Sequence, residues 1–195
     1  MLRERVRKIY SHIPTLETPH LILRKLMRAD AADMNEFSRR EEVSEYLLWD
    51  RHTSMRYTKA CLSDLLRSYR DFTYFEWAVI LKENRKMIGT CGFTKFRYES
   101  NIGEIGYSLN PDYWGRGYAT EAAKATVAFG FSDLGLYRIE AYFVLENTAS
   151  RRVLEHCGMT YRGETHPMVI KGVERKIGLV ALTREEYYAN ATPVG

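Results

Sequence analysis

Short runs of apolar and β-branched residues recur along the chain, and polar or turn-forming residues bound each run. This pattern predicts strands of ordinary length. The runs FEWAVIL and MIGTCGFTKF are joined by the polar segment KENRK, which indicates a β-hairpin, and EIGYSLN adds a third strand to the meander. The first five strands predicted along the chain span residues 20–26, 75–81, 87–96, 104–110 and 137–144.

Between these runs, apolar residues recur at the spacing of one helix face. Asp30 is expected to cap a helix that ends near Arg40. A second helix follows at about residues 53–69, and its inward positions are Leu62, Leu65 and Leu66. Gly135 and Gly158 are placed to end two later helices, because glycine readily adopts the left-handed conformation of a C-terminal cap.

The N-terminal segment has two interpretations. Leu2, Val6 and Ile9 are spaced to share one face, which predicts a short packed or frayed helix. The basic residues around them would also suit an RNA-binding arm, which we regard as the weaker interpretation. We expect one domain over residues 1–195, with residues 1–14 as an N-terminal extension.

The predicted element order is βαα–βββ–α–β–α–ββ, with the last two strands on either side of a Lys171-Gly172 turn. Antiparallel neighbours dominate this order. The one strand–helix–strand crossover, between residues 104 and 144, requires a parallel and right-handed pair. The fold class is therefore mixed α/β, and the single parallel pair is the place where a ligand-sized crevice could open.

Composition excludes several classes of protein. Hydrophobic residues make up 45% and charged residues 28% of the 195 residues, as in globular proteins. No apolar run approaches the roughly 20 residues of a membrane span, and the N-terminus lacks the apolar core of a secretory signal, so a cytoplasmic protein is expected. The separated cysteines, Cys61, Cys91 and Cys157, suggest neither a disulfide framework nor a metal site. A net charge of +4 favours an anionic ligand without demanding nucleic acid.

The segment NPDYWGRGYATEA places two glycines directly before a predicted helix. The free N–H groups and dipole of a helix N-terminus attract anions, and glycine lets a phosphate approach those amides. Arg116 adds a cation, so the loop is interpreted as a phosphate cradle. A Walker P-loop is excluded because GxxxxGK[ST] is absent, whereas a dinucleotide fingerprint, with Thr120 at its third glycine position, and a plain turn remain weaker alternatives.

The longer segment EIGYSLNPDYWGRGYATEA resembles the acetyl-CoA-binding segment of the GNAT N-acetyltransferases, whose loop reads [QR]-x-x-G-x-[GA]. Here it becomes Trp114-x-x-Gly117-x-Ala119, with Trp in place of Gln or Arg. The segments TPHLILRKLMRADAADM, WDRHTS, GTCGF and ENTASRRVLEHCGM also resemble the branch of ribosomal-protein N-terminal acetyltransferases of RimJ/RimL type. The resemblance covers about residues 15–185 in matching order.

This resemblance implies the GNAT fold, with a mostly antiparallel sheet, one parallel pair splayed for acetyl-CoA and helices on both faces. The pyrophosphate would bind the amides of residues 116–120, and the pantetheine arm would lie between the strands that end near Leu109 and Val144. Main-chain groups of Leu109 and Asn110 would pair with the arm like an added strand. The implied cofactor-binding residues are Leu109, Asn110, Trp114, Gly115, Arg116, Gly117, Tyr118, Ala119, Thr120, Asn147 and Ser150.

The same resemblance implies direct acyl transfer to a primary amine, without a metal or a covalent enzyme intermediate. Glu104 aligns with a glutamate that some members use as general base, directly or through water, and Gly106 is expected to leave space beside it. A solvent-facing strand glutamate is the alternative interpretation. Asn147 and Ser150 match the family's N-x-x-S, although Asn147 could simply cap a helix. Many relatives use a helix tyrosine as general acid where this chain has Leu154, so thiolate protonation by water or stabilisation by Ser150 stays open.

The acceptor is less constrained than the cofactor. About a tenth of an α-amine with pKa near 8 is neutral at pH 7, far more than for a lysine, so a protein N-terminus demands less of the base. Small polyamine or antibiotic amines are the alternative acceptors, and a non-catalytic acyl-CoA-binding regulatory domain is the alternative function. The acceptor pocket would be framed by Tyr46, Trp49, Asp50 and the turn after Gly163, although the two aromatic residues are equally suited to the core. We expect no nucleic-acid or membrane partner, and a monomer or homodimer.

Overall fold

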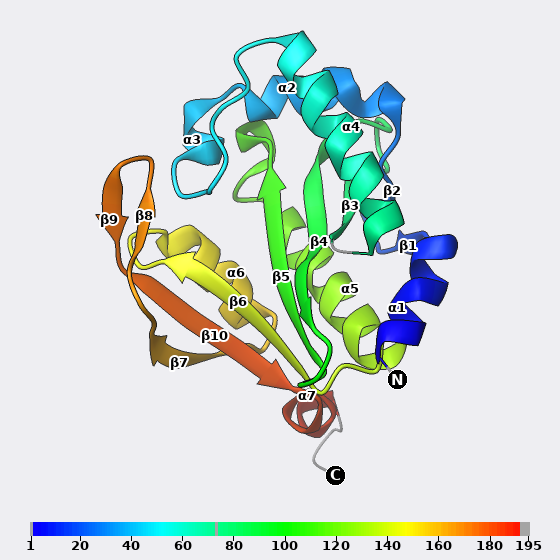
Figure 1. The fold of residues 1–195 in the computed structure, drawn as a ribbon, viewed down its shortest axis with the longest axis vertical. Coiled ribbons are helices and arrows are strands. Elements are labelled where there is room, and N and C mark those ends of the chain that lie inside the picture. The colour runs from blue at the N-terminus through cyan, green and yellow to red at the C-terminus, as the bar shows by residue number, and fades with distance from the viewer. Residues whose placement is uncertain (1, 73, 192–195) are drawn as a thin grey trace.

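The computed structural model describes residues 2–72 and 74–191 (Figure 1). An eight-stranded sheet has the order β1-β2-β3-β4-β5-β6-β10-β7, and β8 and β9 form a separate two-stranded ribbon. The strands are β1 Leu16–Glu17, β2 Leu21–Lys25, β3 Phe75–Leu81, β4 Met87–Arg97, β5 Ile102–Leu109, β6 Arg138–Val144, β7 Thr160–Glu164, β8 Met168–Ile170, β9 Val173–Arg175 and β10 Ile177–Thr183.

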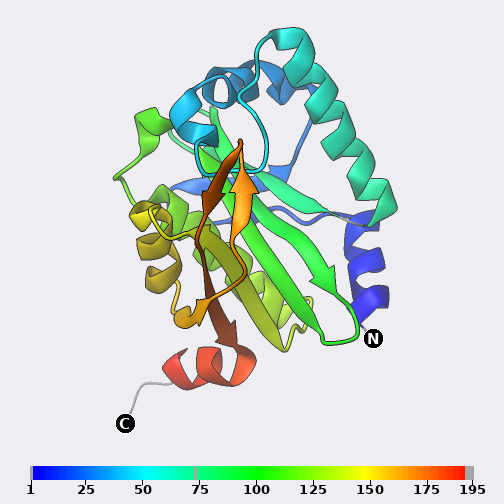
Figure 2. The same ribbon diagram turned by 60° about the vertical axis from the view of Figure 1, so that its left-hand side comes forward.

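Helices cover both faces of the sheet, with α4 on one side and α5 on the other (Figures 1 and 2). The helices are α1 Leu2–Ser11, α2 Ala31–Ser38, α3 Glu41–Ser44, α4 Met55–Asp71, α5 Tyr118–Ser132, α6 Thr148–His156 and α7 Arg184–Ala191, with 3-10 turns η1 Arg28–Asp30 and η2 Pro111–Tyr113. On the α5 side, Phe129 packs edge-on against Trp77 of β3 at 5.2 Å between ring centroids. The predicted mixed α/β class and the β3–β4–β5 meander are confirmed.

The only parallel neighbours in the described sheet are β5 and β6, as the crossover requires. Their pairing comprises Ile102 with Arg138, Gly103 with Ile139 and Glu104 with Glu140. Both strands continue beyond this point, to Leu109 and Val144, and Figure 1 shows them diverging. The splay predicted for the parallel pair is therefore present, and it begins next to Glu104.

The last third of the sheet differs from the prediction of two strands. Lys171 and Gly172 do form a tight turn, with φ of 52° and 79°, but this turn joins only the short strands β8 and β9. The chain then returns to the main sheet as β10, which pairs with both β6 and β7. Helix α7 was not predicted, although Thr183 and Glu186 form a capping box at its start: Glu186 N–H donates to Thr183 Oγ1 at 3.2 Å, and Thr183 N–H donates to Glu186 Oε2 at 2.8 Å.

Two further expectations concern the N-terminal part. The carboxylate of Asp30 does not cap α2; it accepts the N–H of Met27 at 2.7 Å and pairs with Arg24 at 2.6 Å, because the chain makes the 3-10 turn η1 before the helix begins. The N-terminal segment forms the packed helix α1, and Leu2 and Val6 are buried in the main core.

Candidate active site

The loop between β5 and α5 is built as an open cradle of main-chain amides. Gly115 and Gly117 have φ of 72° and 81°, and Gly117 occupies the N-cap position of α5, where no side chain caps the helix. The first helical bond runs from Glu121 N–H to Gly117 O at 2.9 Å, so the amides of residues 118–120 have no acceptor within the helix. A Cβ built on Gly115 or Gly117 would meet no atom within 4 Å, so open space lies in front of these amides.

The charges at this end of α5 suit an anion. The guanidinium of Arg116 lies 5.6 Å from the ring centroid of Tyr113, and Arg116 itself is exposed. Glu121 is the acidic residue of the first turn, but it is directed to β2: its carboxylate accepts the N–H of His20 at 2.8 Å and lies 2.9 Å from His20 Nδ1. Although partial burial acts to raise the pKa of Glu121, hydrogen bonds from Thr18 and His20 lower it.

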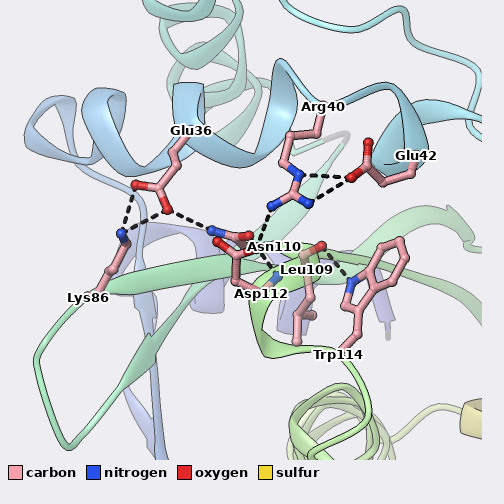
Figure 3. Close-up of polar contacts among 8 residues, drawn as sticks. All are labelled: Glu36, Arg40, Glu42, Lys86, Leu109, Asn110, Asp112 and Trp114. Atoms are coloured by element: carbon pink, nitrogen blue, oxygen red, sulfur yellow. Dashed lines mark hydrogen bonds and ion pairs between the residues drawn. The ribbon is translucent and has the colours of Figure 1, made fainter.

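A polar network attaches this loop to α2 (Figure 3). Asn110 is fully buried, and its Nδ2 donates to Glu36 Oε1 at 2.9 Å; Lys86 Nζ donates to both oxygens of Glu36, at 2.8 and 2.7 Å. Nearby, Arg40 Nη1 donates to Asp112 Oδ1 at 2.5 Å. We did not predict this network, because Glu36 and Asn110 are 74 residues apart and nothing local links them.

Leu109 and Asn110 use their main-chain groups differently. Asn110 N–H donates to Ile88 O at 2.8 Å and its carbonyl accepts Tyr113 N–H at 3.0 Å, so its main-chain groups do not face the splay. The antiparallel pairing of Leu109 with Gly89 turns the main chain of Leu109 away from β4 and toward β6. Its carbonyl accepts Trp114 Nε1 at 2.9 Å. The geometry thus differs from expectation at Asn110, which braces the loop, and leaves Leu109 as the residue facing the gap.

Glu104 lies on β5 at the point where β5 and β6 begin to diverge, and its side chain is half-buried. Burial raises the pKa of its carboxyl, against the opposing effects of a hydrogen bond from Thr94 and of nearby Lys95 and Arg97. Thr94 Oγ1 lies 3.3 Å from Glu104 Oε1. A Cβ on Gly106 would approach the Thr94 methyl to 2.8 Å, so the space expected beside Glu104 is occupied by Thr94.

The carboxylate opposite Glu104 is fully engaged. Glu140 is 5% exposed, pairs with Arg97 and Arg138 (2.8 Å to Arg138 Nε), and accepts the hydroxyl of Tyr142 at 3.1 Å. Both oxygens of Glu140 are thus already occupied, by two guanidinium groups and a phenol hydroxyl. Of the two register partners, Glu104 is therefore the one suited to acid–base chemistry.

A further buried carboxyl lies on the same face of the sheet. Burial raises the pKa of Glu76 to about 7, while hydrogen bonds from Tyr74 and Thr90 oppose the rise. Thr90 Oγ1 in turn lies 3.2 Å from Ser108 Oγ, on the strand that bears Glu104. We did not predict that the pKa of this carboxyl is raised, because the run FEWAVIL indicates only a buried strand.

Ser150 and Asn147 meet on the opposite face of β5. Asn147 is the N-cap of α6, and its Oδ1 accepts Ser150 N–H at 3.0 Å, so the capping interpretation is confirmed. The hydroxyl of Tyr107 lies 2.9 Å from Ser150 Oγ and 3.0 Å from Ser150 O. Burial raises the pKa of Tyr107. Leu154 is 1% exposed, and because leucine has no hydroxyl, α6 offers no proton donor at that position.

The residues expected to frame the acceptor pocket do not form one cluster. Tyr46 packs on Val144 and two neighbouring isoleucines, next to the end of β6. Trp49 instead contacts His52, at 5.6 Å between ring centroids, and packs against the main core. Asp50 is exposed. The Lys171-Gly172 turn was predicted, but its contact with the α3 region was not: Lys171 Nζ donates to Ser44 O and Oγ at 2.7 and 2.9 Å.

Two kinds of feature are absent from the described part of the chain. No group of three or more His, Cys, Asp or Glu side chains within residues 2–72 and 74–191 is arranged to hold a metal ion. In the same part of the chain, no helix combines the length and apolar character needed to cross a membrane.

Solved structures with the same fold give the first comparison. A GNAT-family acetyltransferase from Bacillus anthracis is 27% identical with a TM-score of 0.79, covering 88% of this chain and 99% of that one. The ribosomal-protein-S5-alanine acetyltransferase from Vibrio fischeri is 24% identical with a TM-score of 0.77, covering 89% and 98%. RimL, a ribosomal L7/L12 α-N-protein acetyltransferase solved with coenzyme A, is 15% identical with a TM-score of 0.79, covering 87% and 98%.

Sequence comparison extends the likeness to family level. An uncharacterized N-acetyltransferase of Bacillus subtilis, YoaA, is 31% identical over 150 residues, which cover 77% of this chain and 85% of that protein. Residues 20–160 match the family model described as an acetyltransferase (GNAT) domain. This match includes the amide cradle, Glu104 and the α6 cap, and family members use acetyl-CoA as cosubstrate. The chain belongs to the GNAT acetyltransferases and is an N-acetyltransferase.

Proposed function

We propose that this N-acetyltransferase acts on the α-amine at the N-terminus of a protein. The acetylated product would be an amide at the first residue, as in the ribosomal-protein acetyltransferases whose fold it shares. The α-amine also fits the chemistry of the site. Glu104 has a raised pKa but no cationic partner as close as those of Glu140, so it suits an amine that is already partly neutral near pH 7.

The cofactor would bind across the open end of the sheet. The amides of residues 116–120 would hold the pyrophosphate, and Gly115 and Gly117 would keep the approach clear. The main chain of Leu109 would meet the pantetheine arm, Trp114 would flank it, and Asn147 and Ser150 would contact it from α6. When bound, acetyl-CoA supplies an acetyl thioester, which is activated toward amines.

Glu104 and Ser150 would divide the remaining tasks between the faces of the sheet. Glu104 would take the proton that the attacking amine loses, directly or through water. Ser150, on the other face of β5, would donate a hydrogen bond to the leaving sulfur. This separation supports direct transfer to an amine in one ternary complex, because alternate residues of a single strand reach both sides of the splay.

The proposal is tested by measuring thiol release from acetyl-CoA with three kinds of acceptor. The first is a set of short peptides with a free α-amine at Ala or Ser. The second is the same peptides with a blocked N-terminus and one internal lysine. The third is a panel of polyamines and aminoglycosides. Mass spectrometry would locate the acetyl group. Turnover confined to the free α-amine peptides supports the proposal.

Turnover only of small amines would replace it with the small-molecule acceptor class. Tight binding of acetyl-CoA without turnover of any amine would favour an acyl-CoA-binding regulatory role.

A further inference from the structure

The hydroxyl of Tyr107 lies against both the hydroxyl and the carbonyl oxygen of Ser150. We propose that Tyr107 is a positioning residue that directs the hydroxyl hydrogen of Ser150 toward the leaving sulfur. The inference rests on the proposed function, since it concerns the thiolate that acetyl transfer releases.

The geometry fixes Ser150 from two directions. Asn147 Oδ1 accepts the Ser150 N–H at 3.0 Å, which places the serine in the first turn of α6. Tyr107 reaches it from β5, at 2.9 Å from Ser150 Oγ and 3.0 Å from Ser150 O. Tyr107 alternates with Glu104 along the strand, so its ring lies on the α5 and α6 side of the sheet.

The tyrosine has one hydroxyl hydrogen and two acceptors within reach. If that hydrogen is donated to Ser150 O, the serine hydroxyl can donate to the tyrosine oxygen. If it is donated to Ser150 Oγ, the serine hydrogen is free for another acceptor. An anion beside Ser150 favours the second arrangement, because two aligned donors strengthen each other. Burial raises the pKa of Tyr107, so the phenol keeps its hydrogen and stays a donor.

The chemistry needs such a donor. The acetyl group passes from sulfur to nitrogen, the electron pair of the broken C–S bond stays on sulfur, and the amine proton leaves through Glu104. The sulfur therefore carries a full negative charge until water protonates it. Leu154, one turn beyond Ser150, is buried and has no polar side-chain atom. The Tyr107–Ser150 pair is placed to stabilise that charge from the α6 side.

The test measures the pKa of the thiol of bound coenzyme A, from the ultraviolet absorbance of its thiolate, in the full-length protein. A hydrogen bond to the charged form lowers a pKa. We expect wild-type protein to lower the thiol pKa relative to free coenzyme A, and Ser150→Ala to raise it by about one unit. Tyr107→Phe should raise it by a similar or smaller amount. In the double variant, the rise should not exceed that of Ser150→Ala alone, because Tyr107 acts through the serine.

Tyr69→Phe is the matched control. Tyr69 is also buried, and its hydroxyl donates to a main-chain carbonyl, that of Glu76. Its loss should lower the melting temperature and leave the thiol pKa unchanged. Turnover gives a second readout: Tyr107→Phe should lower kcat while the KM for acetyl-CoA stays within about twofold.

The outcomes separate the two proposals. A wild-type thiol pKa in Tyr107→Phe overturns the inference and leaves the proposed function intact. The inference would also be overturned if Tyr107→Phe raised the thiol pKa equally in wild-type protein and in Ser150→Ala, because the tyrosine would then act independently of the serine. A lowered thiol pKa in wild-type protein that acetylates no amine would remove the proposed function alone.

Discussion

The proposed cofactor loop and the proposed acceptor face are two halves of one candidate site, and they are built by different means. The loop after β5 offers main-chain amides, and its specific requirement is the absence of side chains at Gly115 and Gly117. The acceptor face offers side chains, and each is positioned by partners from distant parts of the chain. A main-chain site is encoded locally and tolerates variation around it. A side-chain site depends on tertiary pairing and can vary with the acceptor.

The largest effect is expected when the main-chain half is blocked. Gly117→Val should weaken acetyl-CoA binding at least about 100-fold, because its side chain would fill the open space before the α5 amides. Calorimetric titration with coenzyme A measures the loss. Gly172→Val is the control: φ is 79° there, no atom lies within 4 Å, and the backbone strain is of the same kind, about 1–3 kcal/mol. Equal affinity in both variants would contradict the cradle.

The side-chain half is broken at Glu104. Glu104→Gln should lower kcat/KM by about 10²–10⁴. A base must be deprotonated to act, so wild-type activity should fall as pH falls through the raised pKa of Glu104, and the variant should lose this limb. The pH profile of thiol release measures it, with Glu99→Gln in the exposed β4–β5 turn as control. A variant that keeps the wild-type acid limb would exclude Glu104 as the base.

Ionisation of the buried Glu76, on the same face of the sheet as Glu104, should also destabilise the fold as the pH rises. Glu76 has a folded-state pKa of about 7, above its unfolded value near 4.5. Protonated Glu76 therefore makes its full contribution to the free energy of unfolding below about pH 4.5. This contribution is lost as the pH rises toward and through about 7. Glu76→Gln, which cannot ionise, should gain stability relative to wild type over this window, by up to about 3 kcal/mol.

Denaturant unfolding at pH 5 and pH 8 measures the difference. A constant difference between the two proteins would show that Glu76 does not titrate in this range.

The smallest effect is expected where the loop and the pantetheine arm would use the same main-chain group. Trp114→Phe removes the indole N–H that donates to Leu109 O. If the pantetheine arm uses the same carbonyl, coenzyme A affinity should rise slightly, by less than about tenfold, because one competing donor is gone. Trp49→Phe is the matched control for the loss of an indole, since Trp49 packs against His52 and the main core. A large loss of affinity in Trp114→Phe would instead show that the indole N–H itself contacts the cofactor.

Some features of this molecule can be predicted from the sequence and others cannot, depending on whether the residues that form them lie close together in the chain. The β3–β4–β5 meander, the crossover and the cradle follow from runs, turns and glycines that lie close together in the chain. Glu104 and Ser150 were identified by family resemblance, and their roles remain proposals. The capping box of α7 was a local signal, Thr183 and Glu186, that we overlooked.

The partners that position the site could not be predicted. Tyr107 and Ser150 are 43 residues apart, and Lys171 reaches Ser44 across 127 residues. Thr94 comes to lie beside Glu104 because the β4–β5 register shifts between Phe93 and Lys95, and no turn or composition marks that irregularity. Such contacts appear only when the strands are placed in register.

The divergence of β5 and β6 has a consequence for the stability of the fold under the proposed function. Strands that diverge inside a sheet leave backbone groups that an entering molecule can pair with, and coenzyme A would fill that place like an added strand. Each tenfold excess of ligand over its dissociation constant adds about 1.4 kcal/mol to the folded state. We therefore expect the melting temperature to rise with the logarithm of the coenzyme A concentration, and proteolysis to become faster when that concentration falls.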